Sequence, residues 1–196
     1  MFYVSTRGGT MPVLSTKAVL DGIAPDGGLY MPEAMPQLDW KAVLDLPVLE
    51  MAEKILGCFL PDFNDMKGIV SRAYTGKFET EDLTPVVPVG ENYVLELFRG
   101  PTSAFKDVAL SALPQLMVAA RQQEGIVDDV MILTATSGDT GKAALAGFQD
   151  VKGTGIIVFY PQDGVSAVQK AQMVTVKSMH QTHGPPGGSC VLRLAS

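Results

Sequence analysis

The sequence predicts an α/β protein in which a small, mainly helical domain precedes part of a parallel sheet. Up to residue 78 the apolar residues recur at helical spacing, and from residue 86 onward short apolar strands alternate with helices. Such alternation is typical of parallel sheets, because each parallel connection crosses over through a helix. We therefore expect a domain at residues 1–78, a partial α/β domain at residues 79–176, and a tail at residues 177–196.

Helical patterning in the first domain covers residues 15–22, 39–59 and 65–75. In the second of these segments, three- and four-residue steps align Leu44, Val48, Met51, Ala52 and Ile55. We expect this apolar stripe to lie in the core. Residues 76–80 have the glycine and polar character of a linker to the next domain.

The second domain alternates strands and helices. We expect strands at residues 93–98, 130–133 and 155–159, with helices at residues 105–124 and 141–149. Ligands in such sheets bind beyond the carboxyl ends of the strands, and the loops at residues 99–105 and 134–141 each follow a predicted strand. The two loops are therefore expected to face one pocket.

Two later segments are assigned no chemistry. Gln169, Lys170 and Gln172 are expected on a solvated helix face. The tail lacks apolar periodicity and carries a Gly/Pro-rich stretch, so we expect no regular structure there.

Composition indicates a soluble enzyme of the cytoplasm. The 196 residues are 46% hydrophobic and carry a net charge of -6, with no basic cluster that would bind a phosphate backbone. We therefore expect no nucleic-acid partner. No apolar run is long enough to cross a bilayer, and the first residues do not read as a secretion signal, so no membrane association is expected.

The cysteines predict neither a disulfide framework nor a metal site. Cys58 and Cys190 lie far apart in sequence, and we expect Cys58 in the core. His180 and His183 could join Cys190 in a metal cluster, but the glycine-proline segment at residues 184–188 is a poor scaffold for fixed ligand geometry. No metal is expected.

Lys106 is the main candidate for chemistry. It lies between Phe105 and Asp107, just after a turn at residues 99–102. An amine attacks a carbonyl only when it is unprotonated, and apolar surroundings disfavour the ammonium form. Lys106 is thus a candidate Schiff-base lysine of the kind that holds pyridoxal phosphate. The alternative is a solvated lysine in the first turn of a helix, which describes most lysines.

A candidate anion site follows the strand at residues 130–133. The loop at residues 134–141 is rich in small polar residues, and a helix begins directly after it. Small residues let the backbone approach a ligand, and the N–H groups of the loop and of the helix start can bind a carboxylate or phosphate. The candidate residues are Ser137, Gly138, Asp139, Thr140 and Gly141. The alternative is an ordinary connection with Asp139 or Thr140 as the helix N-cap.

Together these segments resemble the threonine synthase family, and more broadly the fold-type II pyridoxal phosphate enzymes related to tryptophan synthase β. The likeness rests on GPTSAFKD at residues 100–107 followed, one helix and one strand later, by TATSGDTG at residues 134–141. Near the start, YVSTRG at residues 3–8 and DGGLYMP at residues 26–32 are similar to the amino-terminal signature of threonine synthases. The likeness ends near Thr175.

The resemblance implies roles for the residues that match. Lys106 would bind pyridoxal phosphate covalently and move protons, and Phe105 would lie beside the cofactor ring. The residues from Ser137 to Gly141 would hold the amino acid substrate. The implied reaction converts O-phosphohomoserine and water to threonine and phosphate in threonine biosynthesis, which is carbon-oxygen lyase chemistry. Arg99 stands where the family usually has histidine, and Ser103 where an apolar residue is common.

Members of this family are much longer, and their later glycine-rich loop for the cofactor phosphate has no counterpart among these residues. We therefore expect a truncated chain with weak activity or none. Two other possibilities stay open. One is a different fold-type II lyase or dehydratase acting on serine or threonine. The other is a non-catalytic binding or regulatory fragment that associates with a full-length chain.

Overall fold

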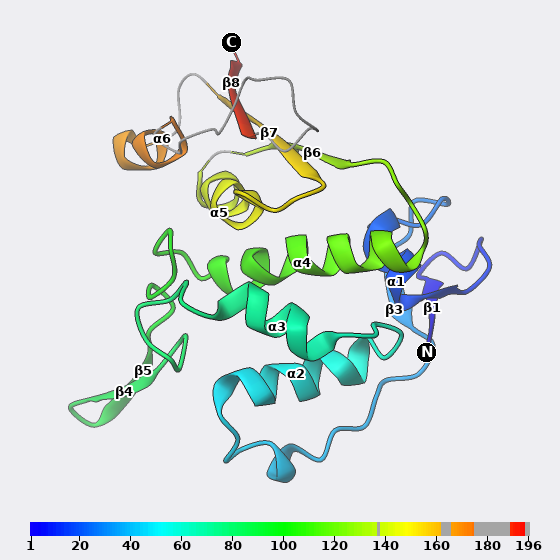
Figure 1. Ribbon diagram of the computed structural model, residues 1–196. Helices are drawn as coiled ribbons and strands as arrows, with labels where there is room; N and C mark the ends of the chain where they lie inside the picture. Colours follow the sequence, from blue (N-terminus) through cyan, green and yellow to red (C-terminus); the bar gives the residue numbers. More distant parts are fainter. Residues whose placement is uncertain (137, 162–165, 175–188, 195–196) are drawn as a thin grey trace. The chain divides into compact units, whose positions relative to one another are not determined.

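A computed structural model describes residues 1–136, 138–161, 166–174 and 189–194. The chain divides into two compact units. Figure 1 shows the chain coloured along the sequence from blue to red. The first unit comprises Met1–Arg72 and Leu116–Val127, and the second comprises Ala73–Gln115 and Asp128–Ser196. The first boundary falls between Arg72 and Ala73, and a later segment of the chain returns to the first unit.

A small antiparallel sheet opens the first unit. Strand β1 (Phe2–Ser5) lies between β2 (Val13–Leu14) and β3 (Tyr30–Pro32). The register pairs Tyr3 with Pro32 and Ser5 with Tyr30, so the residues of the two amino-terminal signature segments are neighbours in space. Helix α1 (Ser15–Asp21) follows β2 directly.

Helices form the rest of the first unit. They are α2 (Val48–Phe59), most of α3 (Met66–Tyr74), and the second half of α4 (Asp107–Gln123). Ile69, Val70 and Ala120 are buried in its core, as the apolar spacing of α3 and α4 predicts.

The helix expected over residues 39–59 begins only at Val48. A 3-10 turn, η1 (Trp40–Ala42), occupies the first part of that segment, and Pro47 holds an extended conformation immediately before α2. Proline has no N–H and clashes with a preceding helical turn, so α2 cannot extend through it. Leu44 is consequently 59% exposed rather than in the core, whereas the other stripe residues are half-buried. Cys58 is also half-buried rather than in the core.

The second unit contains the predicted parallel sheet. Its strand order is β6 (Val130–Ala135), β7 (Thr154–Pro161), β8 (Ser189–Leu194), and both pairings are parallel. Helix α5 (Asp139–Phe148) connects β6 to β7 and packs against β7, and α6 (Ala167–Val174) follows β7 (Figure 1). This arrangement confirms the predicted α/β class.

The tail was expected to lack regular structure, yet residues 189–194 form β8 and extend the sheet. A run of six residues with alternating Cys190, Leu192 and Leu194 is enough to pair with an open strand edge. The rest of residues 177–196 lies outside the described residues.

The strand predicted at residues 93–98 does not belong to the parallel sheet. Strand β5 (Asn92–Leu95) instead pairs antiparallel with β4 (Val86–Val89), which makes a separate hairpin (Figure 1). Gly90 and Glu91 form its two-residue turn, a short connection that suits antiparallel strands. The loop at residues 99–105 therefore does not follow a strand of the parallel sheet, and the sheet-edge argument for a shared pocket fails for that loop.

Helix α4 carries Pro114 in its interior. Pro114 has no N–H to donate to the carbonyl oxygen of Leu110, four residues earlier. Gly147 of α5 packs directly onto that oxygen, since a Cβ atom added to Gly147 would lie 2.0 Å from it. The contact brings the backbones of α4 and α5 together within the second unit.

Candidate functional site

The turn before α4 is anchored by a buried carboxylate. Asp107 is 2% exposed, and its Oδ2 accepts from the backbone N of Thr102 at 2.8 Å. Its Oδ1 accepts from Thr102 Oγ1 at 2.6 Å, and the backbone N of Ala104 lies 3.4 Å from Oδ2. Three donors from the turn thus converge on one side chain. Ser103, between them, takes the left-handed conformation with φ 56°.

Lys106 lies on this turn, one residue before α4 begins. Its side chain is half-buried, and Nζ lies 4.7 Å from the centroid of the Phe105 ring. Phe105 is 57% exposed, so another flat group can reach its ring. The amine therefore stands beside an aromatic surface that a ligand can reach.

The other candidate loop leads into α5. Gly138 is buried and occupies the N-cap position of the helix, where it offers no side-chain acceptor. Its carbonyl oxygen accepts from the backbone N of Gly141 at 3.1 Å and of Lys142 at 3.3 Å, which closes the first turn. The N-cap alternative for Asp139 or Thr140 is wrong, because α5 already includes both residues. Ser137 lies outside the described residues.

Asp139 gathers charged and polar partners from three segments. Its Oδ1 accepts from Gln169 Nε2 at 3.0 Å and lies 3.2 Å from Lys142 Nζ. The hydrogen bonds from Gln169 and Lys142, helped by the charges of Lys142 and Lys106, hold the pKa of Asp139 below its ordinary value against the opposing effect of desolvation. Both sequence motifs lie in the second unit.

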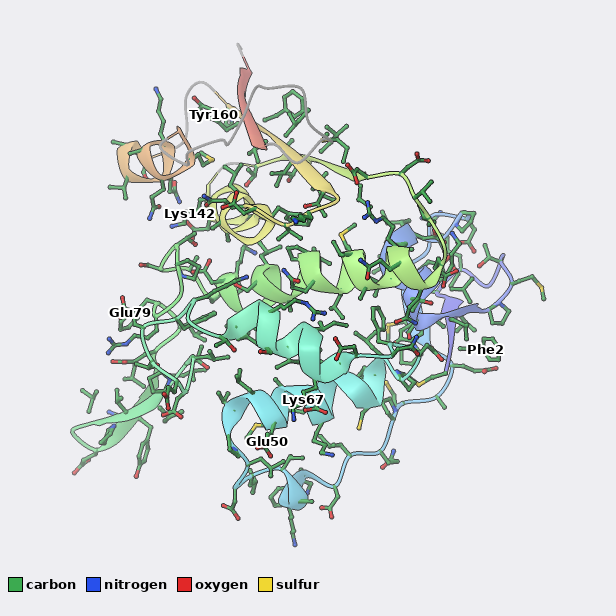
Figure 2. The ribbon with its side chains drawn as sticks, viewed as in Figure 1. Phe2, Glu50, Lys67, Glu79, Lys142 and Tyr160 are labelled. Atoms are coloured by element: carbon green, nitrogen blue, oxygen red, sulfur yellow. The ribbon has the colours of Figure 1, made fainter. Side chains whose placement is uncertain are left out.

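Two residues of this cluster were missed by the sequence analysis. Lys142, on the first turn of α5 (Figure 2), is only 8% exposed although it is a lysine. Gln169 was expected on a solvated face, yet it is half-buried and bonded to Asp139, whereas Lys170 is exposed as predicted. Gln172 is half-buried too, so the solvated-face prediction is wrong for both glutamines.

The signal for Gln169 was present in the sequence. Ser166 and Gln169 have the S-x-x-Q spacing of a capping box, and the two residues do cap the start of α6 reciprocally. What the spacing could not supply is the contact with Asp139, thirty residues earlier.

Arg99 does not offer a free cation to a ligand. Its guanidinium binds Glu96 through Nε at 2.8 Å and through one amino nitrogen at 2.6 Å, and the other amino nitrogen lies 3.0 Å from Glu79. These carboxylates, Glu96 first, raise the pKa of Arg99. Because two acids already neutralise its charge, Arg99 is better suited to holding the chain before the turn than to binding an anion.

The amino-terminal signature segments form a local network in the first unit. Asp26 accepts from Ser5 Oγ at 2.7 Å, from Gly9 N at 2.8 Å and from Gly28 N at 2.9 Å. The guanidinium of Arg7 donates to the Asp26 backbone carbonyl at 2.9 Å. These contacts give the aspartate a structural role, which is to fix the loop after β1 against the turn before β3.

This network predicts acid sensitivity. The hydrogen bond from Ser5, followed by that from Gly28 N, lowers the pKa of Asp26 below its ordinary value of 3.8. A lowered folded-state pKa stabilises the fold above the unfolded value, and this stabilisation is lost as the pH falls through the folded value. We expect the melting temperature of Asp26→Asn to depend less steeply on pH between about pH 5 and pH 2.

Circular dichroism melting curves across that range measure the effect, with the exposed Asp45→Asn as the matched control. Parallel pH curves for the unchanged chain and Asp26→Asn would contradict the role given to this carboxylate.

Across the described residues, no helix has the length and apolar character needed to cross a membrane. In the same part of the chain, no three His, Cys, Asp or Glu side chains are grouped to hold a metal ion. His180 and His183 lie outside the described residues, and the Cys190 side chain is not described.

The comparisons with known proteins agree with these motifs. Residues 2–74 match the family described as threonine synthase N terminus. The threonine synthase of Schizosaccharomyces pombe is 38% identical over 89% of this chain and 36% of its own length. That of Pseudomonas aeruginosa is 37% identical over 90% of this chain and 38% of its own length.

Solved structures extend the likeness to three dimensions. The chain superposes on pyridoxal phosphate-bound threonine synthase from Brucella melitensis with a TM-score of 0.80 and 38% identity, over 88% of this chain and 38% of that one. For yeast threonine synthase the TM-score is 0.79 at 32% identity, again over 88% and 38% of the two chains.

The fold is therefore part of the α/β fold of the fold-type II pyridoxal phosphate enzymes, preceded by a mainly helical amino-terminal region. Within that class, the chain corresponds to the amino-terminal portion of threonine synthases, as its motifs predict. It spans 36% to 38% of the length of the two curated relatives described above.

Proposed function

We propose that this chain carries the cofactor lysine and the substrate loop of a threonine synthase, which converts O-phosphohomoserine and water to threonine and phosphate. The observation that carries the proposal is the place of both motifs in the second unit, where Gly147 of α5 packs onto the Leu110 backbone of α4. We further propose residues 1–78 and 79–176 as its amino-terminal and partial cofactor-binding domains. The family match over residues 2–74 supports the first of these. A cytoplasmic location is part of the proposal.

The residues present fit pyridoxal phosphate. Lys106 provides a half-buried primary amine, and the exposed Phe105 offers an aromatic surface against which a pyridine ring can pack. When bound, the cofactor supplies an electron sink for carbanion chemistry at the substrate. In this proposal Lys106 Nζ would hold the cofactor, and the same nitrogen would move protons to and from the substrate.

The loop at residues 134–141 would bind the substrate carboxylate. The positive end of α5 favours an anion, although the N–H groups of Gly138 and Gly141 already donate to Thr136 Oγ1 and to the Gly138 carbonyl oxygen. The negative charge of Asp139 opposes an anion, but Lys142 Nζ lies 3.2 Å from Asp139 Oδ1. Lys142 thus offsets the charge of Asp139 at the start of α5.

Visible absorbance tests the lysine directly. We expect the purified chain to develop, on mixing with pyridoxal phosphate, a band that differs from the free aldehyde and that disappears in Lys106→Ala. Lys152→Ala, which alters an exposed lysine of the same unit, should keep the band. A band would justify assaying phosphate release from O-phosphohomoserine. A folded chain without any Lys106-dependent band would refute the proposed cofactor site.

A further inference from the structure

Gln169 touches two consecutive residues of the loop at residues 134–141. Its Nε2 donates to Asp139 Oδ1 at 3.0 Å. A Cβ atom added to Gly138 would lie 2.6 Å from Gln169 Nε2 and 2.7 Å from Cδ, so the amide packs flat against the Gly138 backbone. A side chain at position 138 would therefore collide with the Gln169 amide.

The same amide also begins the helix that carries it. Gln169 Oε1 accepts from the backbone N of Ser166 at 3.2 Å, and the backbone N of Gln169 donates to Ser166 Oγ at 3.2 Å. The oxygen end of the amide is thus committed to α6 and the nitrogen end to Asp139. Turning the amide over would set its NH₂ against the backbone N–H of Ser166 and its oxygen against the carboxylate of Asp139. The orientation of the amide is therefore fixed.

We propose that Gln169 is a positioning residue that holds Gly138 to Gly141 in the arrangement that binds the substrate carboxylate. The inference rests on the proposed function. Through Gly138, whose carbonyl oxygen accepts from Gly141 and Lys142, the hold extends into the first turn of α5. Because Gln169 is neutral, it fixes Asp139 without adding charge to the loop.

The groups that face Asp139 come from three segments. Lys142 faces it from its own helix, Lys106 from the turn before α4, and Gln169 from α6. The two lysines act mainly through charge, which falls off gradually with distance. Gln169 acts through a directional hydrogen bond, and it is the partner that also touches Gly138.

Gln169→Glu separates this role from simple helix capping. Glutamate at this position still accepts from Ser166 N, because S-x-x-E is a capping box as well. It cannot donate to Asp139, and it sets a second carboxylate against the first. Ser166→Ala makes the reverse change, since it removes the capping hydroxyl and leaves the bond to Asp139. Gln122→Glu, at an exposed position of α4, is the matched control.

Amide hydrogen exchange measured by NMR reads out the loop without requiring activity. The probes are the N–H groups of Gly141 and Lys142, with Ile156 and Val158 of β7 reporting global stability. In Gln169→Glu we expect exchange about tenfold faster at the two loop probes and unchanged in β7. We also expect the carboxyl pKa of Asp139 to rise. Ser166→Ala and Gln122→Glu should leave both readouts as they are.

Equal exchange in Gln169→Glu and the unchanged chain would overturn the inference, as would a loss confined to Ser166→Ala. Should Gln169→Glu fail to fold, Gln169→Met removes both the NH₂ group and the carbonyl oxygen of the amide without adding charge. It is expected to speed exchange at the same two probes, and unchanged exchange there would count against the inference.

The absorbance of each variant with pyridoxal phosphate keeps the two proposals apart. A chain without the Lys106-dependent band but with faster loop exchange in Gln169→Glu would refute the cofactor site and support the positioning of the loop. A Lys106-dependent band together with unchanged exchange in Gln169→Glu would support the cofactor site and refute the positioning of the loop. If both hold, Gln169→Glu should keep the band and bind O-phosphohomoserine about tenfold more weakly, measured as the concentration that perturbs the band.

Discussion

Replacing Gly147 with alanine is expected to destabilise the second unit by about 2 to 3 kcal/mol. The added Cβ would lie 2.0 Å from the carbonyl oxygen of Leu110 and 2.9 Å from its carbon, and both are backbone atoms that no rotamer change can move aside. Relief requires α4 and α5 to separate. Pro114 already leaves this oxygen without the usual N–H four residues later, so the close approach of Gly147 fits the irregular part of α4.

Thermal unfolding followed by circular dichroism measures the effect, and we expect a melting temperature lower by roughly 4 to 12 °C. Gly57→Ala is the matched control, because it makes the same change inside helix α2 where an added Cβ meets no atom within 4 Å. That control should gain about 0.5 to 1 kcal/mol from helix propensity. Equal or higher stability of Gly147→Ala would contradict the packing described for α4 and α5.

Local patterns predicted most of the regular structure. The three-residue and four-residue steps of α3 and the apolar runs of β6 and β7 were enough to place these elements, because their burial is repeated at every turn or alternate residue. The errors arose at single residues. Pro47 delays α2, and the turn at Gly90 folds β5 back onto β4 instead of sending it into the parallel sheet.

The candidate site was found in the sequence where residue type alone marks it. Lys106 and the loop at residues 134–141 stand out in this way, and they remain a prediction. Gln169 and Asp107 were not found as supports of these motifs. Their roles depend on contacts that form only in the folded chain. Gln169 bonds Asp139, thirty residues away in sequence, and Asp107 bonds Thr102 inside a tight turn.

Asp107 supports the turn that carries Lys106, and Asp107→Ala is expected to destabilise the second unit by about 3 kcal/mol. Removal of the carboxylate leaves Thr102 N and Thr102 Oγ1 buried without their acceptor. The turn would then lose the contacts that fix its end just beside Lys106. We therefore expect the Lys106-dependent absorbance with pyridoxal phosphate to weaken even at temperatures where the variant is folded.

Asp107→Asn distinguishes lost geometry from lost charge. The amide oxygen can still accept from Thr102 N, and the hydroxyl of Thr102 can rotate to accept from the new NH₂ group. We expect this variant to lose about 1 kcal/mol and to keep the absorbance band, because the turn stays closed. Glu91→Ala, an exposed acid of the same unit, controls for net charge. If Asp107→Asn loses the band as fully as Asp107→Ala while both stay folded, the charge of Asp107 and not its anchoring of the turn governs Lys106.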